Sequence, residues 1–291
     1  MHKSGFVNII GNPNVGKSTL MNALLGEKLS IMTPKAQTTR HRIFGILNEE
    51  DLQIVFSDTP GVLEPAYELQ KSMMEFVKSS FEDADLFLLM TEPGEKGLKN
   101  EEIYQMLEKA EQPVFVVINK IDKTTQEELE QMVNSWKEKL PESEIHPISA
   151  LNNFQTDVLL NRIKELLPES PPFYDKEQLS DRNERFFVSE MIREQILLNY
   201  KKEIPYAVEV DVEDFKEAEN IIRMRAIIYV ERDTQKAIII GHQGKMIKRT
   251  GIGARKRLED FFQKQVHLDL HVKVRKNWRS DERELKRFGY K

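Results

Sequence analysis

A glycine-rich stretch near the N-terminus combines residue types that bind phosphate. It runs from Gly11 to Ser18, fits the pattern G-x-x-x-x-G-K-S, and follows an apolar run, 6–10, that predicts a strand. Glycines let backbone N–H groups curl around phosphate oxygens, and the start of a helix adds a favourable dipole. We therefore expect Lys17 to reach the β- and γ-phosphates of a nucleotide and the Ser18 hydroxyl to ligate Mg²⁺.

The whole loop is predicted to contact the nucleotide, through Gly11, Asn12, Pro13, Asn14, Val15, Gly16, Lys17, Ser18 and Thr19. Asn14 has a second predicted role, because its side chain is placed to ligate K⁺ beside the β- and γ-phosphates. A cation there would supply the positive charge that an arginine finger supplies in other nucleotide hydrolases. Lys17 and Asn14 are accordingly predicted to be catalytic.

Two downstream segments are predicted to complete the Mg²⁺ site. Asp58-Thr59-Pro60-Gly61 follows a predicted strand, so that Asp58 can hold the ion from the far side and the Gly61 N–H can touch the γ-phosphate. The segment Gln37–His41 offers Thr38 and Thr39. A threonine there completes the Mg²⁺ shell only while the γ-phosphate is present, which makes the segment an order–disorder switch. We favour Thr39 over Thr38, as a metal ligand and as a catalytic residue.

Two further motifs are predicted to read the base. Asn119-Lys120-Ile121-Asp122 ends the predicted strand 114–118. The Asp122 carboxylate can accept from guanine N1–H and the 2-amino group, whereas adenine offers neither donor and would leave the carboxylate unpaired. Lys120 would lie along the base, and Ser149-Ala150-Leu151 would supply a backbone N–H to guanine O6. All four motifs come where strands end, the edge at which α/β sheets bind ligands, and together they predict a GTP site.

The residue after Gly61 is Val62, where GTPases of the Ras and Gα type place a glutamine that orients the attacking water. Valine cannot hydrogen-bond a water. We therefore expect slow intrinsic turnover or a different catalytic arrangement.

A second glycine pair, Gly241-His242-Gln243-Gly244, lies in basic surroundings. It follows the apolar run 238–240, which predicts a strand, and precedes a predicted helix that carries Lys245, Lys248 and Arg249. In KH modules such a G-x-x-G loop clamps about four nucleotides of single-stranded RNA. We therefore predict that these seven residues bind RNA. A helix N-terminus with a solvated basic face is the alternative interpretation.

Alternating strands and helices before residue 167 predict an α/β fold, a P-loop GTPase domain with a doubly wound, mostly parallel sheet. The proline-rich stretch after it predicts a linker. A smaller α+β domain follows, with its last strand at 266–274. The predicted division is 1–167, 168–181 and 182–291. In the second domain Ile247 and Ile252 are predicted to be core residues, and Trp278 a packing residue.

Composition restricts the remaining possibilities. The 291 residues contain no cysteine, which excludes disulfides, zinc ribbons, iron–sulfur clusters and thiol nucleophiles, and fits a reducing compartment. Apolar runs are too short for a membrane-spanning helix, and no signal-peptide pattern precedes the first strand, so we expect a cytoplasmic protein. The net charge is −10 over residues 1–170 but +10 over 236–291. This asymmetry indicates that the C-terminal part meets a polyanion.

With these motifs in this order, the chain resembles the Era family of bacterial GTPases, which carry a C-terminal KH domain. The resemblance extends to the tail, from Trp278 through Asp281-Glu282 to Phe288-Gly289-Tyr290. It implies a switch that binds GTP and GDP with Mg²⁺, binds the 3′ end of 16S ribosomal RNA and assists 30S subunit maturation. It also implies a type II-like KH domain, a monomer, and peripheral contact with the inner face of the cell membrane. The segment Leu151–Phe154 departs from the family pattern because it lacks a glycine.

Other functions stay open at this point. A P-loop kinase or metabolic NTPase is disfavoured because it has no need for a guanine-reading carboxylate at Asp122. A plain RNA-binding module with a structural nucleotide site is a second alternative. A third is a GTPase that acts on another RNA, such as tRNA or precursor rRNA, or at the membrane in cell-cycle control.

Overall fold

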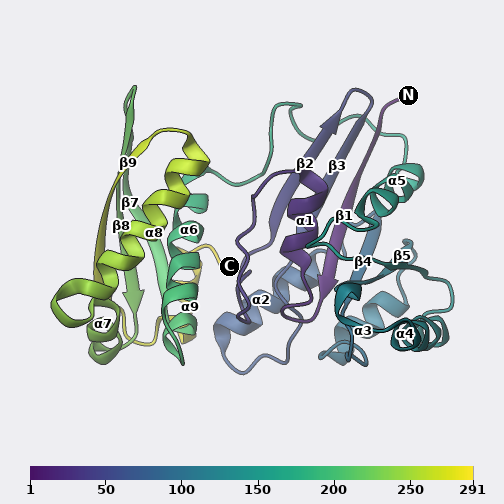
Figure 1. Ribbon diagram of the computed structural model, residues 1–291, viewed down its shortest axis with the longest axis horizontal. Coiled ribbons are helices and arrows are strands. Elements are labelled where there is room, and N and C mark those ends of the chain that lie inside the picture. Colours follow the sequence, from purple (N-terminus) through teal and green to yellow (C-terminus); the bar gives the residue numbers. More distant parts are fainter. Residues whose placement is uncertain (291) are drawn as a thin grey trace. The chain divides into compact units, whose positions relative to one another are not determined.

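The chain folds into two units, each with its own sheet and hydrophobic core (Figure 1). The structure is a computed structural model and describes residues 1–290. The first unit comprises Met1–Ala66 and Gln70–Asp181. The second unit comprises the chain from Arg182 onward together with the short stretch Tyr67–Leu69. In the described part of the chain, no helix combines the length and the apolar character needed to cross a bilayer.

The first unit is built on a six-stranded sheet with the order β2-β3-β1-β4-β5-β6. Only β2 runs antiparallel, against β3; all other neighbours are parallel. Strands β2 and β3 lie on one side of β1, and β4, β5 and β6 lie on the other, so the direction in which strands are added reverses at β1. Ligands of α/β sheets bind at such a switch point. The strands are β1 (Lys3–Gly11), β2 (Ile43–Glu49), β3 (Leu52–Asp58), β4 (Leu86–Thr91), β5 (Val114–Ile118) and β6 (Glu144–Pro147).

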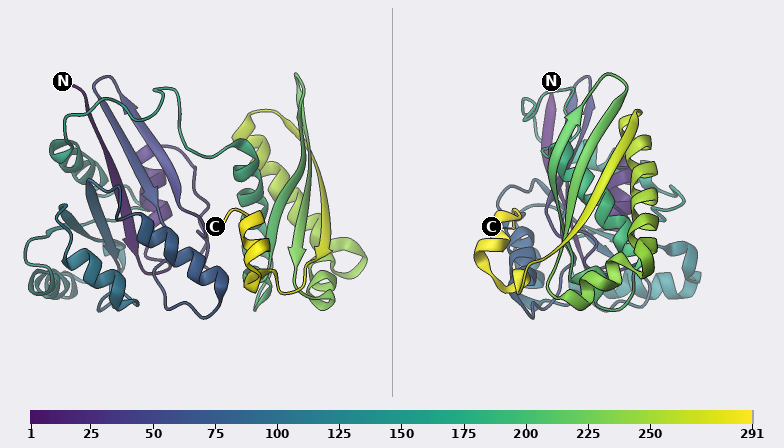
Figure 2. Two further views of the ribbon diagram at one scale, coloured as in Figure 1. Left: turned by 180° about the vertical axis from the view of Figure 1, so that it is seen from behind. Right: turned by 90° about the vertical axis from the view of Figure 1, so that its left-hand side faces the viewer.

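Helices cover both faces of this sheet, which is why β3 and β4 are buried along their whole length. Helices α1 and α5 lie on one face, and α2 and α3 lie on the other (Figures 1 and 2). Helix α4 packs beside the edge strand β6. The helices are α1 (Lys17–Leu25), α2 (Glu68–Ser79), α3 (Glu101–Glu108), α4 (Gln126–Lys139) and α5 (Thr156–Leu166).

The fold class predicted from the sequence is confirmed: a P-loop type α/β unit with a mostly parallel sheet precedes a smaller α+β unit. Strand β2 was not anticipated. It lies at the sheet edge and mixes buried with partly exposed residues, so its sequence lacks the unbroken apolar run of the inner strands. A hairpin at 49–52 joins it to β3, and the backbone hydrogen bonds between the two strands hold β2 in the sheet although its hydrophobicity pattern does not indicate a strand.

The proline-rich segment 168–181 lies along the edge of the first unit. The Gln53 side chain accepts from Phe173 N at 2.7 Å and Tyr174 N at 3.0 Å, and donates to Tyr174 O at 2.9 Å. Farther along, Ile46 N donates to Leu179 O at 2.9 Å. The buried amide of Gln53 therefore fixes a segment that its composition predicts to be a free linker.

The second unit has a three-stranded sheet in the order β7-β8-β9, with β7 antiparallel and β9 parallel to the central β8. Helices α6 and α8 pack against each other over one face of this sheet (Figures 1 and 2). Its elements are α6 (Glu184–Asn199), β7 (Glu209–Glu217), β8 (Ile221–Val230), α7 (Asp233–Ile240), α8 (Lys245–Phe262), β9 (Gln265–Val274) and α9 (Glu282–Arg287), with short 3-10 turns at Ile204–Tyr206, His242–Gly244 and Trp278–Ser280.

The prediction of a strand at 238–240 is wrong, because these residues form the end of α7. Three consecutive isoleucines favour a strand by propensity, but tertiary context overrides that preference. Gln235 and Ile239, four residues apart, are buried while Ile238 is 47 % exposed, which is the pattern of one buried helix face. Upstream, the Gln235 side chain accepts from the backbone N–H groups of Glu231 and Arg232 and so starts the helix.

Packing of the C-terminal tail follows the prediction for Trp278. Its side chain is fully buried, and its indole N–H donates to Ala207 O at 3.2 Å. Tyr290 is also buried, and its hydroxyl donates to Glu209 Oε2 at 2.6 Å. The tail is therefore part of the core of the second unit.

Candidate functional site

The loop between β1 and α1 has the backbone shape that a phosphate cradle requires. Asn14 and Gly16 adopt positive φ angles of 71° and 101°. A Cβ at Gly16 would lie 2.3 Å from Asn119 Nδ2, and one at Gly11 would lie 2.4 Å from Met90 O. Gly16 is therefore required by its backbone conformation and by the close approach of Asn119, and Gly11 by the close approach of Met90.

Lys17 is buried beneath this loop. Its Nζ donates to Gly11 O at 3.0 Å and to Asn12 O at 2.9 Å. Burial lowers the pKa of Lys17 to about 8, although the carboxylates of Asp58 and Glu95 oppose this shift. The ammonium is thus held at the floor of the cradle, among groups that an anionic phosphate would replace.

Three oxygen-bearing side chains from separate elements meet beside Lys17. Ser18 Oγ donates to Asp58 Oδ2 at 2.6 Å, and Thr39 Oγ1 lies 3.0 Å from Ser18 Oγ and 3.3 Å from Asp58 Oδ2. Thr38 instead bonds Thr33 and the Lys35 carbonyl, at 2.7 and 2.6 Å. The structure therefore brings together the two hydroxyls and the carboxylate that the sequence analysis assigned to the metal, with Thr39 rather than Thr38.

This cluster fits a hard divalent cation. Asp58 is fully buried, and its Oδ1 has no hydrogen-bond partner in the described part of the chain. Burial raises the pKa of Asp58, while hydrogen bonds from Ser18 and Thr39 and the charge of Lys17 act in the opposite direction. An unpaired buried carboxylate oxygen next to two hydroxyls is the oxygen-rich environment that Mg²⁺ prefers.

The base-reading motifs are tied to one another and to the phosphate loop. Asn119 donates to Val15 O at 2.8 Å and accepts from Ala150 N at 2.9 Å. Ser149 Oγ donates to Asp122 Oδ1 at 2.6 Å, which orients the carboxylate. Three segments that lie up to 135 residues apart in sequence are thus tied together by side-chain hydrogen bonds.

Lys120 connects the base-reading motif 119–122 to the phosphate loop. It has a positive φ of 62°, and its Nζ donates to Asn14 O at 2.7 Å and pairs with Glu92. Lys120 is thus held at the wall of the cavity described next.

A cavity of about 530 Å³ opens between these groups, large enough for a nucleotide. Its walls come from the phosphate loop, the segment 31–39, Gly61, Lys120 and Leu151. Val62 does not face it: the side chain is fully buried, and its N–H donates to Gly11 O at 2.9 Å. No water-orienting side chain therefore occupies this position.

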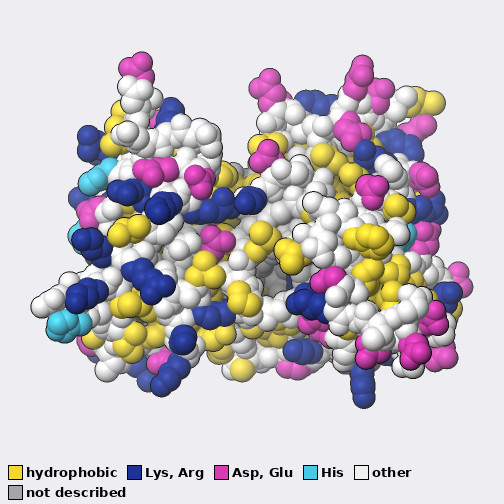
Figure 3. All heavy atoms as spheres, viewed as in Figure 1, with side chains coloured by type: hydrophobic (Ala, Val, Ile, Leu, Met, Phe, Trp, Pro, Cys, Tyr) yellow, Lys and Arg dark blue, Asp and Glu magenta, His cyan; other side chains and the backbone are white. Residues whose placement is uncertain are grey.

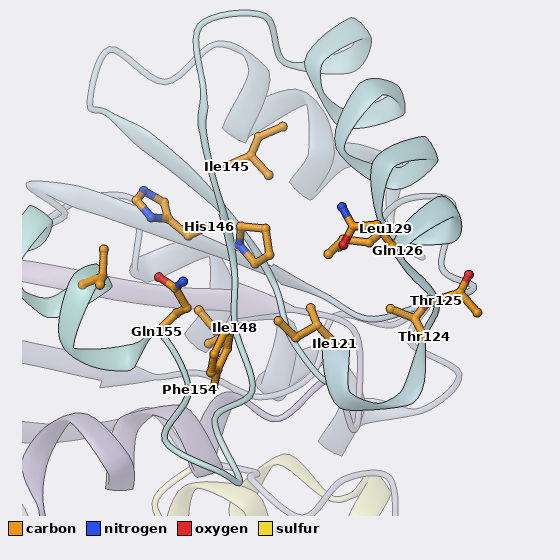
Figure 4. A pocket seen from close by; sticks show the side chains of 12 residues that line it. Ile121, Thr124, Thr125, Gln126, Leu129, Ile145, His146, Ile148, Phe154 and Gln155 are labelled. Carbon is orange, nitrogen blue, oxygen red and sulfur yellow. The ribbon is translucent and has the colours of Figure 1, made fainter.

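A second cavity, of about 470 Å³, lies behind the base-reading loops, and the sequence did not indicate it (Figure 4). It runs along β6 between α4 and α5, and Ile121, Ile148 and Phe154 contribute to its wall. Ile121 stands between Lys120 and Asp122, and its N–H donates to Ile148 O at 3.2 Å. This backbone bond connects the base-reading motif to the segment after β6, next to the cavity.

The second glycine pair connects α7 to α8 as a tight, exposed loop. Gly241 and Gly244 have φ angles of 71° and 72°, and Gln243 is also left-handed at 51°. A Cβ on Gly241 would lie 2.6 Å from Met246 Cγ, whereas nothing lies within 4 Å of one on Gly244. Gly241 is therefore required by packing, and Gly244 leaves open space above the loop.

A groove of about 380 Å³ lies between α8 and β9. Its floor is apolar, with Ile252 and Leu268, and its rim carries Lys248 and Arg255. Lysine and arginine side chains gather over the α8 face of this unit (Figure 3). The prediction that Ile252 is a core residue is wrong, since it is 44 % exposed and lines the groove.

Lys245 and Arg249 lie in the first turns of α8, next to the loop. His267, on β9, is exposed and lines the opposite wall of the groove. Among residues 1–290, no group of three or more His, Cys, Asp or Glu could hold a metal ion, and His271 bonds Asp269 instead. An apolar floor with a basic rim suits bases and phosphates of a single strand.

Comparison with known proteins agrees with both units. The family described as "50S ribosome-binding GTPase" matches residues 6–120, and the family described as "KH domain" matches residues 203–279. GTPase Era of Thermoanaerobacter sp. (strain X514) is 43% identical over 292 residues, 99% of this chain and 97% of the relative.

Solved structures of Era align over the whole chain. A complex with MgGDPNP and nucleotides 1506–1542 of 16S ribosomal RNA has a TM-score of 0.95 and 39% identity, covering 100% of this chain and 99% of the other. A single-residue variant of Era from Aquifex aeolicus bound to GDP·AlF₄⁻ has the same TM-score and identity, covering 99% of each chain. With GTPase and KH units in this order and such identity over the full length, the chain belongs to the Era family of GTPases.

Proposed function

We propose that this protein is a guanine-nucleotide switch that binds the single-stranded 3′ end of 16S ribosomal RNA during assembly of the 30S subunit. The observation that carries the proposal is one chain holding both a guanine-reading framework, Asp122 with Ser149, and a G-x-x-G loop beside a basic-rimmed groove. The related complex with a GTP analogue and 16S nucleotides supports the pairing of these two sites.

In the first unit, Ser18, Thr39 and Asp58 would hold Mg²⁺. When bound, the ion would supply positive charge that neutralises the charge developing on the phosphates. Lys17 exchanges its two carbonyl partners for phosphate oxygens. Because Thr39 reaches the site from the segment 37–41, loss of the γ-phosphate removes the contact that orders this segment.

Val62 is buried and apolar, so it cannot orient the attacking water, and stabilisation of the charge that develops on the phosphates becomes the main requirement for hydrolysis. We assign this role to Lys17 together with K⁺ at Asn14, whose side chain is exposed beside the phosphate loop. The segment 168–181, which packs along the edge of the first unit and leads into the second at Arg182, is proposed to transmit nucleotide state to RNA access. A monomeric state, a cytoplasmic location and peripheral membrane contact stay predictions of the family resemblance.

Thr39→Ala is expected to slow single-turnover GTP hydrolysis roughly tenfold or more and to raise the Mg²⁺ concentration needed for half-maximal rate, because a metal ligand is lost. Thr38→Ala, the matched control, removes the hydroxyl that contacts Thr33 and the Lys35 carbonyl and should stay within about threefold. Rapid-quench measurements across a Mg²⁺ titration check both. A larger loss in the Thr38 variant would reverse the assignment.

The RNA assignment is tested by calorimetry with an oligonucleotide of the 16S 3′ end and a scrambled control, each with a GTP analogue, GDP or no nucleotide. We expect tighter binding of the genuine sequence in the GTP-analogue state. Turnover measured in KCl and in NaCl tests the cation at Asn14. Equal affinity for both oligonucleotides, or crosslinks in cells to tRNA or precursor rRNA alone, would reject the proposed RNA partner.

A further inference from the structure

The loop between β4 and α3, residues 92–100, is attached to the phosphate loop by one side chain. Asn12 is 2 % exposed, and its Nδ2 donates to Glu95 Oε1 at 3.0 Å and to Gly97 O at 2.9 Å. Its Oδ1 accepts from Lys99 N at 2.9 Å. Both donors and the acceptor of this amide are therefore used on a single loop that lies more than 80 residues away in sequence.

Glu95 is held in place from its own side. Thr91 Oγ1 donates to Glu95 Oε2 at 3.3 Å, and Glu95 N donates to Glu92 O at 3.1 Å. Each carboxylate oxygen thus has one partner, one of which is the phosphate-loop residue Asn12. The carboxylate also acts on Lys17, whose pKa it raises against the larger lowering effect of burial.

Asn12 in turn supports the phosphate-binding lysine. Its main-chain oxygen accepts from Lys17 Nζ at 2.9 Å, next to the bond from Lys17 to Gly11 O. A shift of Asn12 would therefore displace the floor of the cradle together with Lys17.

We propose that Glu95 is a positioning residue for nucleotide binding, acting through the Asn12 side chain to hold the phosphate loop and Lys17. Glu95 does not line the nucleotide cavity, so it acts on the ligand only through these residues. A bond from a neutral amide to an ionised carboxylate is stronger than one between neutral groups, which makes Glu95 the main anchor among the three Asn12 partners. The inference rests on the proposed nucleotide site.

The test measures KM, kcat and the dissociation rate of a fluorescent GDP analogue with the full-length protein. Glu95→Ala is expected to raise KM for GTP and the GDP dissociation rate about tenfold, as for one charge-assisted hydrogen bond, with kcat changed less than twofold. Glu95→Gln keeps an acceptor for Asn12 and should recover most of the loss. Lys96→Ala is the matched control, since it alters an exposed neighbour and keeps the backbone carbonyl that Lys139 contacts.

A double-mutant cycle shows whether the effect passes through Asn12. In an Asn12→Ala background, adding Glu95→Ala should cost less than twofold. A full tenfold cost there, or an unchanged KM in Glu95→Ala, would overturn the proposal, as would loss of thermal stability alone with the same KM. Failure of the unmodified protein to bind the analogue would instead reject the nucleotide site itself.

Discussion

Replacing Asp122 with asparagine is expected to change the base preference of the protein from guanine to xanthine. The carboxylate can accept from both N1–H and the 2-amino group of guanine, whereas the asparagine amide would set its own NH₂ against the 2-amino group. Xanthine carries a carbonyl at that position, which accepts from the new amide. One charge-assisted hydrogen bond is lost, the other becomes a weaker neutral bond, and two donors face each other; together these cost about 3–6 kcal/mol, so GTP affinity should fall by at least roughly 100-fold.

The measurement is competition of GTP and XTP for a bound fluorescent GDP analogue, and XTP should now compete better than GTP. The side-chain oxygen of asparagine can still accept from Ser149 Oγ, so the loop around Asp122 should keep its shape. Asp157→Asn makes the same chemical change on the exposed start of α5 and serves as the control. Unchanged GTP affinity in the Asp122 variant would show that another group reads the base.

Gly244→Asp is expected to weaken RNA binding about tenfold or more and to leave GTP affinity unchanged. Gly244 has a φ of 72° and a ψ of 10°, a region that aspartate and asparagine tolerate better than other side chains. A side chain there points into open space, where the proposed RNA site would hold phosphates. The new carboxylate would therefore repel the ligand without disturbing the fold.

Gly244→Asn separates charge from shape, since it has the same size and similar backbone preference, and it should stay within about threefold of the unmodified protein. Calorimetry at two salt concentrations adds a second criterion. The difference between the two variants should shrink as salt rises, because added salt screens the repulsion. Equal losses in both variants would mean that the loop acts by shape and not by contact with phosphates.

Several features of this protein follow directly from short stretches of sequence. The phosphate loop is local: its glycines, Lys17 and Ser18 act within one strand–turn–helix, so their spacing predicts their geometry. The inner strands, such as 114–118, are continuous apolar runs because both sheet faces are covered. Asp122 is identified by its position after such a strand. In each case the residues that decide the structure are neighbours in the chain.

Other features depended on tertiary structure. Gln37–His41 offers two adjacent threonines, and only packing shows that Thr39 meets Asp58 while Thr38 turns to Lys35. The run 238–240 prefers a strand but is helical, because burial of Ile239 matters more than local propensity.

The groove residue Ile252 and the bond from Asn12 to Glu95 were equally hidden from the sequence. Contacts between residues more than 80 positions apart leave no periodic pattern, and exposure of one helix face depends on what the rest of the chain packs against it. The sequence by itself therefore determined the chemistry of each motif. The tertiary structure decided which side chains meet and which stay exposed, because those choices arise from long-range packing.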